Sequence, residues 1–159
     1  YETGETIPDE LINKILKASK FNQGFINTEY LAASLLDMDW HTLKAEDELK
    51  DANKFEKISM NKYGLISEIA PRYRSTYFAH IFSGGYSAGY YSYVHSAVLD
   101  SDGFEAFKET GDVFNQSLSE KLRTHVYEKG STEEAMDLYV KFRGKKPSIE
   151  PLLKVRGLD

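Results

Sequence analysis

The sequence contains no cysteine, so disulfides and thiolate metal sites are excluded for this chain. It also has no apolar run long enough to cross a bilayer and no segment with the pattern of a signal peptide. Basic residues are in the minority, because 20 Lys and Arg stand against 25 Asp and Glu, a net charge of -5. Binding to phosphates needs clustered basic side chains, so neither a nucleic acid nor a membrane is expected as a partner.

Several catalytic motifs are absent as well. Hydrolytic zinc sites often use a helical His-Glu-x-x-His, which supplies two ligands and a general base, and that spacing does not occur here. The histidines are far apart, and His41, His95 and His125 are expected to be surface or satisfied core residues. No G-x-S-x-G nucleophile elbow, G-x-G-x-x-G or G-K-[ST] is found. The chain by itself therefore predicts no metal site, serine nucleophile or nucleotide site.

Helical periodicity of the apolar residues dominates what the sequence does contain. The predicted helices run from Pro8 to a break at 22–24 and over 28–36, 46–62, 86–99, 115–128, 131–142 and 148–155, with 38–41 either helical or a turn. Residues 72–78 alternate large side chains with β-formers and favour short extended structure. The fold class is therefore mainly α, a helical bundle with at most minor β. No repeat or linker divides residues 1–159.

Some helix boundaries are predicted from single residues. Thr28 is a candidate N-cap, and Ser131 with Glu134 matches the capping-box pattern. Asp102 and Gly103 are expected to end or kink the helix that precedes them.

The segment with the most unusual composition is 78–93, where a glycine pair precedes a run of tyrosines. Gly84 and Gly85 interrupt the helical pattern and allow another backbone to approach closely. His80 lies just before this pair and is placed to fold back over the residues that follow. The segment is therefore the strongest candidate for a binding site.

The tyrosines of this segment follow a helical spacing. Tyr86, Tyr90 and Tyr93 stand at i, i+4 and i+7, so a helix through them would carry all three on one face. Several neutral hydrogen-bond donors would then converge beside a glycine loop, an arrangement that can hold a peptide and a developing oxyanion. The alternative from the residues alone is a tyrosine-rich packing edge beside a glycine turn.

The pattern His-x-Phe-x-Gly-Gly-Tyr-x-Ala-Gly-Tyr-Tyr-x-Tyr at 80–93 resembles the loop motif of the family of thimet oligopeptidase, oligopeptidase A and peptidyl-dipeptidase Dcp. The resemblance extends over almost the whole chain and is strongest to the Dcp branch. Further segments that resemble that branch are Thr3-Gly4-Glu5, Phe21-Asn22-Gln23-Gly24, residues 35–41, 71–75 and 139–145, and Arg156-Gly157-Leu158.

This resemblance implies a mostly helical zinc metallopeptidase in which two lobes face each other across a deep channel. The Dcp branch releases C-terminal dipeptides from short peptides. Zinc would be held by a His-Glu-x-x-His helix and a further glutamate, all before Tyr1. Residues 1–159 would then form the C-terminal part of the catalytic domain, inactive alone, with short peptides and the missing N-terminal part as partners. Exposed apolar surface would make the isolated chain self-associate.

The resemblance also implies roles for single residues. Tyr93 would stabilise the oxyanion, and His80 would contact the substrate near the scissile bond. Substrate-binding roles fall on Tyr86, Tyr90, Gly84 and Gly85. No metal ligand is implied within this chain.

The chain departs from the family pattern at one position, and two of its arginines are further candidates for substrate binding. His95 stands where the family has an aromatic residue, usually tryptophan, and is expected to pack rather than react. Arg72 and Arg74 are candidates for binding a substrate C-terminal carboxylate, although structural or surface ion pairs are the more common use of such residues.

A second function class is a helical peptide-binding or interaction domain without catalysis. The residues encoded before Tyr1 separate the two classes, because a His-Glu-x-x-His helix there would indicate the enzyme. The resemblance favours a cytoplasmic protein and leaves a secreted or periplasmic one open.

Overall fold

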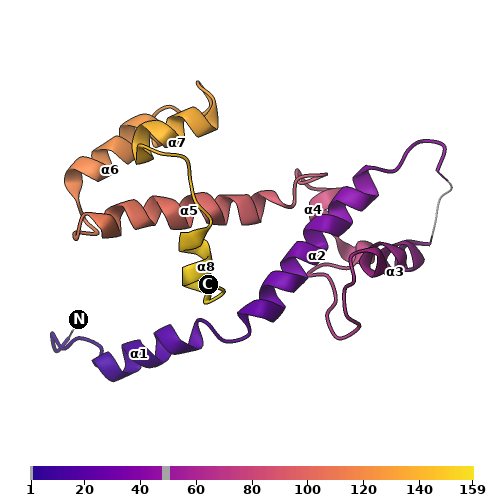
Figure 1. The fold of residues 1–159 in the computed structure, drawn as a ribbon, viewed down its shortest axis with the longest axis horizontal. Helices are drawn as coiled ribbons and strands as arrows, with labels where there is room; N and C mark the ends of the chain where they lie inside the picture. The colour runs from indigo at the N-terminus through magenta and orange to yellow at the C-terminus, as the bar shows by residue number, and fades with distance from the viewer. Residues whose placement is uncertain (1, 48–50) are drawn as a thin grey trace. The chain divides into compact units, whose positions relative to one another are not determined.

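The computed structural model describes residues 2–47 and 51–159, which form helices joined by turns and irregular segments (Figure 1). In chain order the helices are α1 (Asp9–Ala18), α2 (Gln23–His41), α3 (Ala52–Lys62), the 3-10 helix η1 (Ser75–Tyr77), α4 (Ala79–Phe82), α5 (Ser92–Glu109), α6 (Gln116–Leu122), the π-helix η2 (Arg123–Tyr127), α7 (Ala135–Arg143) and α8 (Glu150–Arg156).

The described residues contain no strand, so the mainly α prediction is confirmed. The extended structure expected at 72–78 is wrong over 75–77, which form η1. No helix in the described part of the chain is long and apolar enough to span a membrane.

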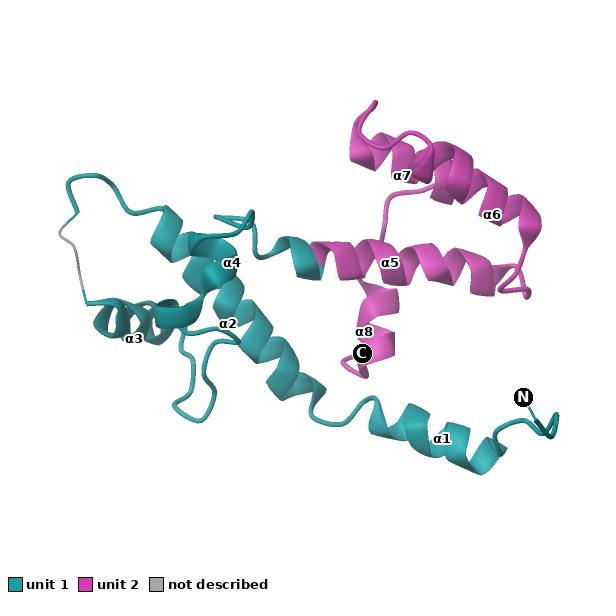
Figure 2. Ribbon diagram, turned by 180° about the vertical axis from the view of Figure 1, so that it is seen from behind, with its two compact units in different colours: residues 1–94 teal, residues 95–159 magenta. Residues whose placement is uncertain are grey.

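The chain divides into two compact units, residues 1–94 and 95–159 (Figure 2). Unit 1 contains α1 to α4 and the first turn of α5, and unit 2 contains the rest of α5 and α6 to α8. Each unit has its own cluster or clusters of buried apolar side chains.

Helix α2 begins at Gln23 and not at Thr28. Asn22 precedes it in the left-handed region, with a φ of 56°, a conformation that asparagine tolerates better than most residues. The Thr28 hydroxyl donates to the Gly24 carbonyl at 2.8 Å inside the helix. The predicted cap at Thr28 is therefore wrong, because its hydroxyl bonds back to the preceding turn.

Helix α3 is shorter than predicted. It begins at Ala52, and the Asp51 carboxylate caps it by accepting the Lys54 amide at 2.9 Å. A start at Glu46 is wrong, because residues 45–47 form a turn. Leu49, which the prediction placed on the apolar face of this helix, lies outside the described residues.

The core of unit 1 lies on two sides of α2. One cluster contains Ala32, Leu36, Phe55 and Met60, and the other contains Ala33, Phe78, Ile81 and Tyr90. Trp40 packs against both clusters, and its indole N–H donates to the Ser75 hydroxyl at 2.9 Å. Helix α2 therefore ties α3 to the segment that carries the glycines and tyrosines.

Unit 2 corrects the predicted break at 102–103, since α5 continues through it to Glu109. Asp102 is buried and accepts hydrogen bonds from the Tyr139 hydroxyl at 2.5 Å and from Arg143 Nε at 3.0 Å. Gly103 lies under Phe142, whose ring would be 3.6 Å from an added Cβ. The Asp-Gly pair is thus a packing site for α7 rather than a helix end.

The predicted helix over 115–128 is confirmed as α6 followed by η2, with the Asn115 side chain capping it by accepting the Leu118 amide at 2.9 Å. The predicted cap at Ser131 is wrong. Helix α7 begins at Ala135 after Glu134, and Thr132 instead extends the preceding turn by donating to Lys129.

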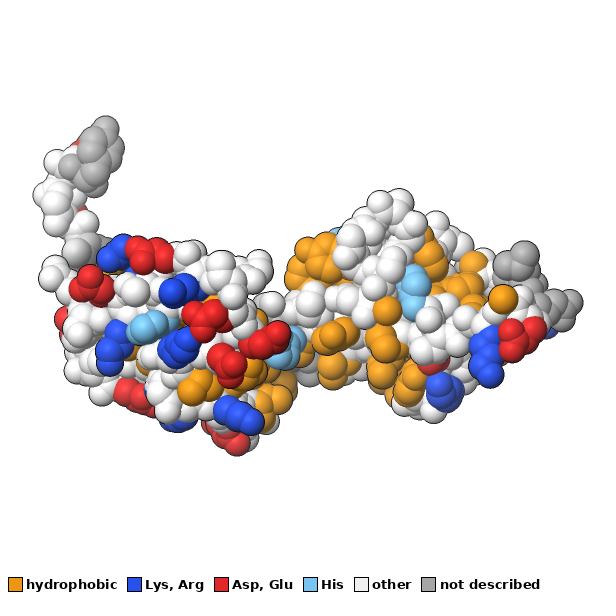
Figure 3. All heavy atoms as spheres, turned by 90° about the horizontal axis from the view of Figure 1, so that it is seen from above, with side chains coloured by type: hydrophobic (Ala, Val, Ile, Leu, Met, Phe, Trp, Pro, Cys, Tyr) orange, Lys and Arg blue, Asp and Glu red, His pale blue; other side chains and the backbone are white. Residues whose placement is uncertain are grey.

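Many large apolar side chains are exposed in both units, and Figure 3 shows them on one face of the molecule. Helix α1 is the clearest case, because none of its residues is buried. Its apolar face consists of Leu11, Ile12, Ile15 and Leu16.

Candidate functional site

The segment Ser83–Tyr91, here named the Gly-Tyr loop, begins where α4 ends. The amides of Ser83 and Gly84 both donate to the Ala79 carbonyl, at 2.9 and 2.8 Å, and the Tyr86 amide donates to the His80 carbonyl at 3.1 Å. These bonds fold the chain back over α4, and the helix ends just before the glycine pair, which was predicted to interrupt the helical pattern.

The predicted helix over 86–99 is wrong in its first part. Residues from Tyr86 to Tyr91 form turns, and α5 begins at Ser92. Ala88 has a positive φ of 52°, which no α-helix accommodates. The tyrosines of the loop are therefore not on one helical face.

The side chains nevertheless converge. The rings of Tyr86 and Tyr93 stack with centroids 4.9 Å apart, and Tyr90 meets Tyr93 edge-on at 5.2 Å. The centroid of the His80 ring lies 6.1 Å from that of Tyr86 and 6.5 Å from that of Tyr93. The turn at Ala88 thus brings together the residues that the helical spacing was expected to align.

Two aromatic residues join this cluster without having been predicted. Tyr30 of α2 stacks on Tyr90 at 5.5 Å, and Tyr73 lies 4.6 Å from the His80 ring. Neither stands at a periodic spacing from the loop. The available signals were the large number of tyrosines, 11 in the chain, and, for Tyr73, its place in the segment 71–75 that resembles the family.

Exposure separates the members of the cluster. Tyr90 is 1% exposed and belongs to the core, whereas His80, Tyr86 and Tyr93 are partly exposed. Tyr90 can therefore support its neighbours from beneath, and the other side chains can reach a bound molecule.

His80 has an unusual polar environment. Its Nδ1 atom is buried and has no hydrogen-bond partner among the described residues. A buried polar atom without a partner costs stability, and in a native protein each such atom calls for an explanation, of which a catalytic role is one. Of the predicted site residues, His80 has the strongest independent structural indication.

The phenols of Tyr90 and Tyr93 are held in their protonated form. A hydrogen bond with Tyr86, followed by desolvation, raises the pKa of Tyr93 to about 12. Burial, followed by a hydrogen bond with Tyr30, raises the pKa of Tyr90 well above its usual range. At neutral pH both groups keep a proton, so Tyr93 can act as a neutral hydrogen-bond donor.

The two arginines differ. Arg74 forms an ion pair with the buried Glu56, whose other carboxylate oxygen accepts the Ser75 amide at 2.7 Å. Arg72 is exposed and makes no ion pair within the described ranges, and its charge lowers the pKa of Tyr90 against the larger effects that raise it. Arg72 is therefore the better candidate for a substrate carboxylate.

His95 is exposed on α5, which agrees with the expectation of a surface histidine, and its packing in the full-length protein stays a prediction.

The two loop glycines also differ, and the difference predicts unequal effects of substitution on stability. An added Cβ at Gly84 would lie 2.8 Å from the His80 carbonyl oxygen, whereas Gly85 has no atom within 4 Å of that position. Gly84→Ala is expected to lower the free energy of unfolding by about 1–3 kcal/mol. Gly85→Ala, the control, is expected to change it by less than about 1 kcal/mol. Urea denaturation measures both; equal effects would contradict the geometry.

The resemblance implies zinc ligands only before Tyr1 and none within this chain. Within residues 2–47 and 51–159, no three His, Asp or Glu side chains come together as a group that could hold a metal ion. His41 pairs with Asp37, its Nδ1 lying 2.8 Å from the Asp37 Oδ1 atom. The described residues therefore do not fit a zinc site of their own.

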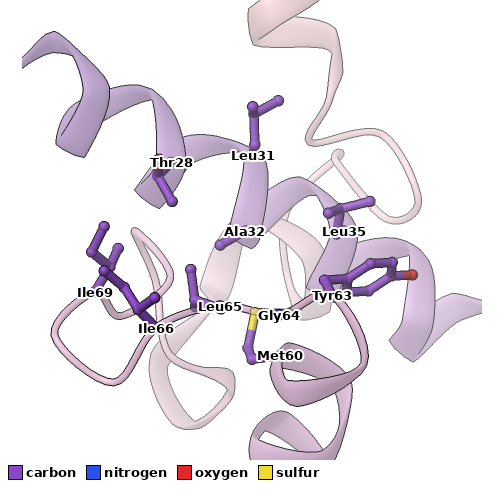
Figure 4. Close-up of a pocket in the computed structure, with 10 residues that line it drawn as sticks. All are labelled: Thr28, Leu31, Ala32, Leu35, Met60, Tyr63, Gly64, Leu65, Ile66 and Ile69. Carbon is purple, nitrogen blue, oxygen red and sulfur yellow. The ribbon is translucent and has the colours of Figure 1, made fainter.

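A separate concave surface lies between α2 and residues 60–69 (Figure 4). It encloses about 360 Å³ and is lined mainly by apolar side chains: Leu31, Ala32, Leu35, Met60, Leu65, Ile66 and Ile69. No histidine or charged group lines it. This surface is concave but has no histidine or charged side chain that could take part in a reaction. The cluster at the Gly-Tyr loop is therefore the better candidate for a catalytic site.

Comparison with known proteins identifies the family. The model described as Peptidase family M3 matches residues 1–158, so this chain belongs to that family. It is 41% identical to dipeptidyl carboxypeptidase of Escherichia coli over 160 residues, 34% identical to oligopeptidase A of Haemophilus influenzae over 161, and 32% identical to saccharolysin of Saccharomyces cerevisiae over 162.

These matches cover 100%, 99% and 100% of this chain, but only 23%, 23% and 22% of the respective relatives. The chain thus spans less than a quarter of the length of the relatives it matches.

Proposed function

We propose that residues 1–159 form the substrate-binding, oxyanion-stabilising C-terminal part of the catalytic domain of a zinc metallopeptidase that releases C-terminal dipeptides from short peptides. The observation that carries the proposal is the convergence of His80, Tyr86 and Tyr93 on the Gly-Tyr loop of a chain that belongs to family M3.

In this proposal the loop holds the peptide at the bond to be cleaved. Hydrolysis adds water across the scissile amide, and negative charge develops on the carbonyl oxygen in the transition state. The Tyr93 hydroxyl donates a hydrogen bond to that oxygen. His80 and Tyr86 contact the peptide beside it, and Tyr90 supports Tyr93 from the core.

The glycines complete the binding surface. Gly84 is needed where the loop passes close to the His80 carbonyl, while the open space around Gly85 allows a peptide backbone to approach. Arg72 is the group proposed to bind the C-terminal carboxylate, which would favour release of a dipeptide over internal cleavage.

Zinc and its ligands belong, in this proposal, to the remainder of the protein. When bound, zinc polarises the substrate carbonyl and activates water. That remainder and short peptides are the proposed partners. The isolated chain is proposed to self-associate through its exposed apolar side chains. The resemblance favours a cytoplasmic location.

A direct comparison of two proteins tests the proposal. The full-length, zinc-loaded protein is expected to release dipeptide from an N-blocked short peptide, and the 159-residue chain with added zinc is expected to release none. Chromatography of the products measures both, with the zinc-depleted full-length protein as control. Absence of dipeptide from the full-length protein would overturn the proposal. Peptide binding without cleavage would instead favour the non-catalytic peptide-binding domain, whose basis is the same aromatic cluster.

A further inference from the structure

Asp37 is the most completely buried charged side chain near the Gly-Tyr loop, although it lies on α2. Its relative exposure is 0%. One carboxylate oxygen accepts the Ala88 amide at 2.9 Å, and the other accepts the Tyr90 amide, also at 2.9 Å. His41 Nδ1 lies 2.8 Å from the first oxygen. A buried carboxylate is costly without partners, and here both of its oxygens have them.

The hydrogen bonds that Asp37 accepts come from the part of the Gly-Tyr loop with the unusual backbone conformation. Ala88 has a φ of 52°, a left-handed conformation that residues with a Cβ rarely adopt. Asp37 binds the amide of this residue and that of Tyr90, and so holds the turn at Ala88 together with the residue that follows Gly89. The conformation is therefore maintained by a side chain 51 residues away in the sequence and not by the loop alone.

The turn at Ala88 also determines where Tyr86, Tyr90 and Tyr93 lie relative to one another. Directly after it the Tyr93 amide donates to the Tyr90 carbonyl at 3.3 Å, and the rings of the two residues meet at 5.2 Å. Tyr86, before the turn, stacks on Tyr93 at 4.9 Å. A shift of the turn would separate the phenol that precedes it from the phenol that follows it.

We propose that Asp37 is a positioning residue: its buried carboxylate fixes the Gly-Tyr loop to α2 and thereby places the Tyr93 hydroxyl for the reaction. The kinetic part of this inference rests on the proposed function, whereas the structural part does not. Asp37 touches no substrate in this account and acts through the loop backbone.

Hydrogen exchange tests the structural part in the 159-residue chain. NMR is expected to show the Ala88 and Tyr90 amides protected at least about tenfold more than the Gly85 amide, because a hydrogen-bonded amide must open before it exchanges. Asp37→Asn is expected to reduce this protection at least about tenfold. Asp102→Asn, which changes the buried carboxylate of unit 2, is the matched control and should leave the loop unchanged.

Kinetics of the full-length, zinc-loaded protein test the positioning role. Asp37→Asn is expected to lower kcat at least about tenfold with KM within about twofold, and to have almost no further effect when combined with Tyr93→Phe. A loss of equal size in the Tyr93→Phe background would overturn the proposal, since Asp37 would then not act through Tyr93.

The outcomes also separate the two proposals. If the Ala88 and Tyr90 amides of the unsubstituted chain exchange as fast as that of Gly85, the positioning proposal is overturned, even if Asp37→Asn does not fold. If they are protected but Tyr93→Phe leaves kcat unchanged, the proposed function fails, and with it the kinetic role of Asp37, while the structural clamp stands.

Discussion

Replacing Tyr93 by phenylalanine in the full-length, zinc-loaded protein is expected to lower kcat about a hundredfold or more, with little change in KM. The substitution removes one hydrogen-bond donor and keeps the ring that stacks on Tyr86. A donor that acts on a developing oxyanion contributes about 2.7–4 kcal/mol to the transition state and little to substrate binding. Quantifying released dipeptide over a range of substrate concentrations separates kcat from KM.

The raised pKa of Tyr93 predicts how the effect of Tyr93→Phe varies with pH. Because that pKa is raised to about 12, the phenol keeps its proton throughout the neutral range. The ratio of the two kcat values should therefore stay constant from about pH 6 to about pH 9, below the titration of the phenol.

Tyr127→Phe is the matched control, since its side chain is 72% exposed, lies outside the Gly-Tyr loop and, within the described residues, stacks on no other ring. It is expected to leave both constants unchanged. Unaltered kinetics in Tyr93→Phe would remove the donor role and leave the loop as a packing or gating element.

A large loss of stability is expected from Phe78→Ala. Phe78 is 0% exposed and packs against Tyr73 at 5.4 Å and Tyr90 at 4.9 Å. Truncating a buried phenylalanine removes its apolar burial and leaves a cavity, at a cost of about 3–5 kcal/mol. Urea denaturation followed by Trp40 fluorescence measures this in unit 1, because Trp40 is the one tryptophan of the chain and packs against the same cluster.

Phe82→Ala provides the comparison within the same short segment. Phe82 is 52% exposed, so its truncation should cost about 1 kcal/mol or less. Phe78→Leu, which keeps most of the buried volume, should fall between the two. Similar losses for Phe78→Ala and Phe82→Ala would contradict the placement of Phe78 in the core.

The composition of the aromatic cluster could be predicted only in part. The motif at 80–93 identified His80, Tyr86, Tyr90 and Tyr93, and the structure brings their rings together. The reason given for their convergence, a common helical face, was wrong. What produces it is the left-handed Ala88, held by Asp37, and no local pattern reports a partner so distant in sequence.

Several predictions of helix boundaries were wrong for a related reason. Asp102-Gly103 has the composition of a turn, yet Asp102 is bound by Tyr139 and Arg143, and Gly103 makes room for Phe142. The positions of most helices were predictable because they depend on apolar periodicity. Their ends were less so, since these depend on contacts made only after the chain has folded.

Helix α1 has 10 residues and buries none of them, although one of its faces is apolar. Isolated helices shorter than about 12–15 residues are marginal in water, because the cost of nucleation is spread over few hydrogen bonds. The helix–coil equilibrium of α1 is therefore governed by whatever covers that face. In a complex α1 would be among the last segments to order, and its helicity would report on association rather than on the folding of unit 1.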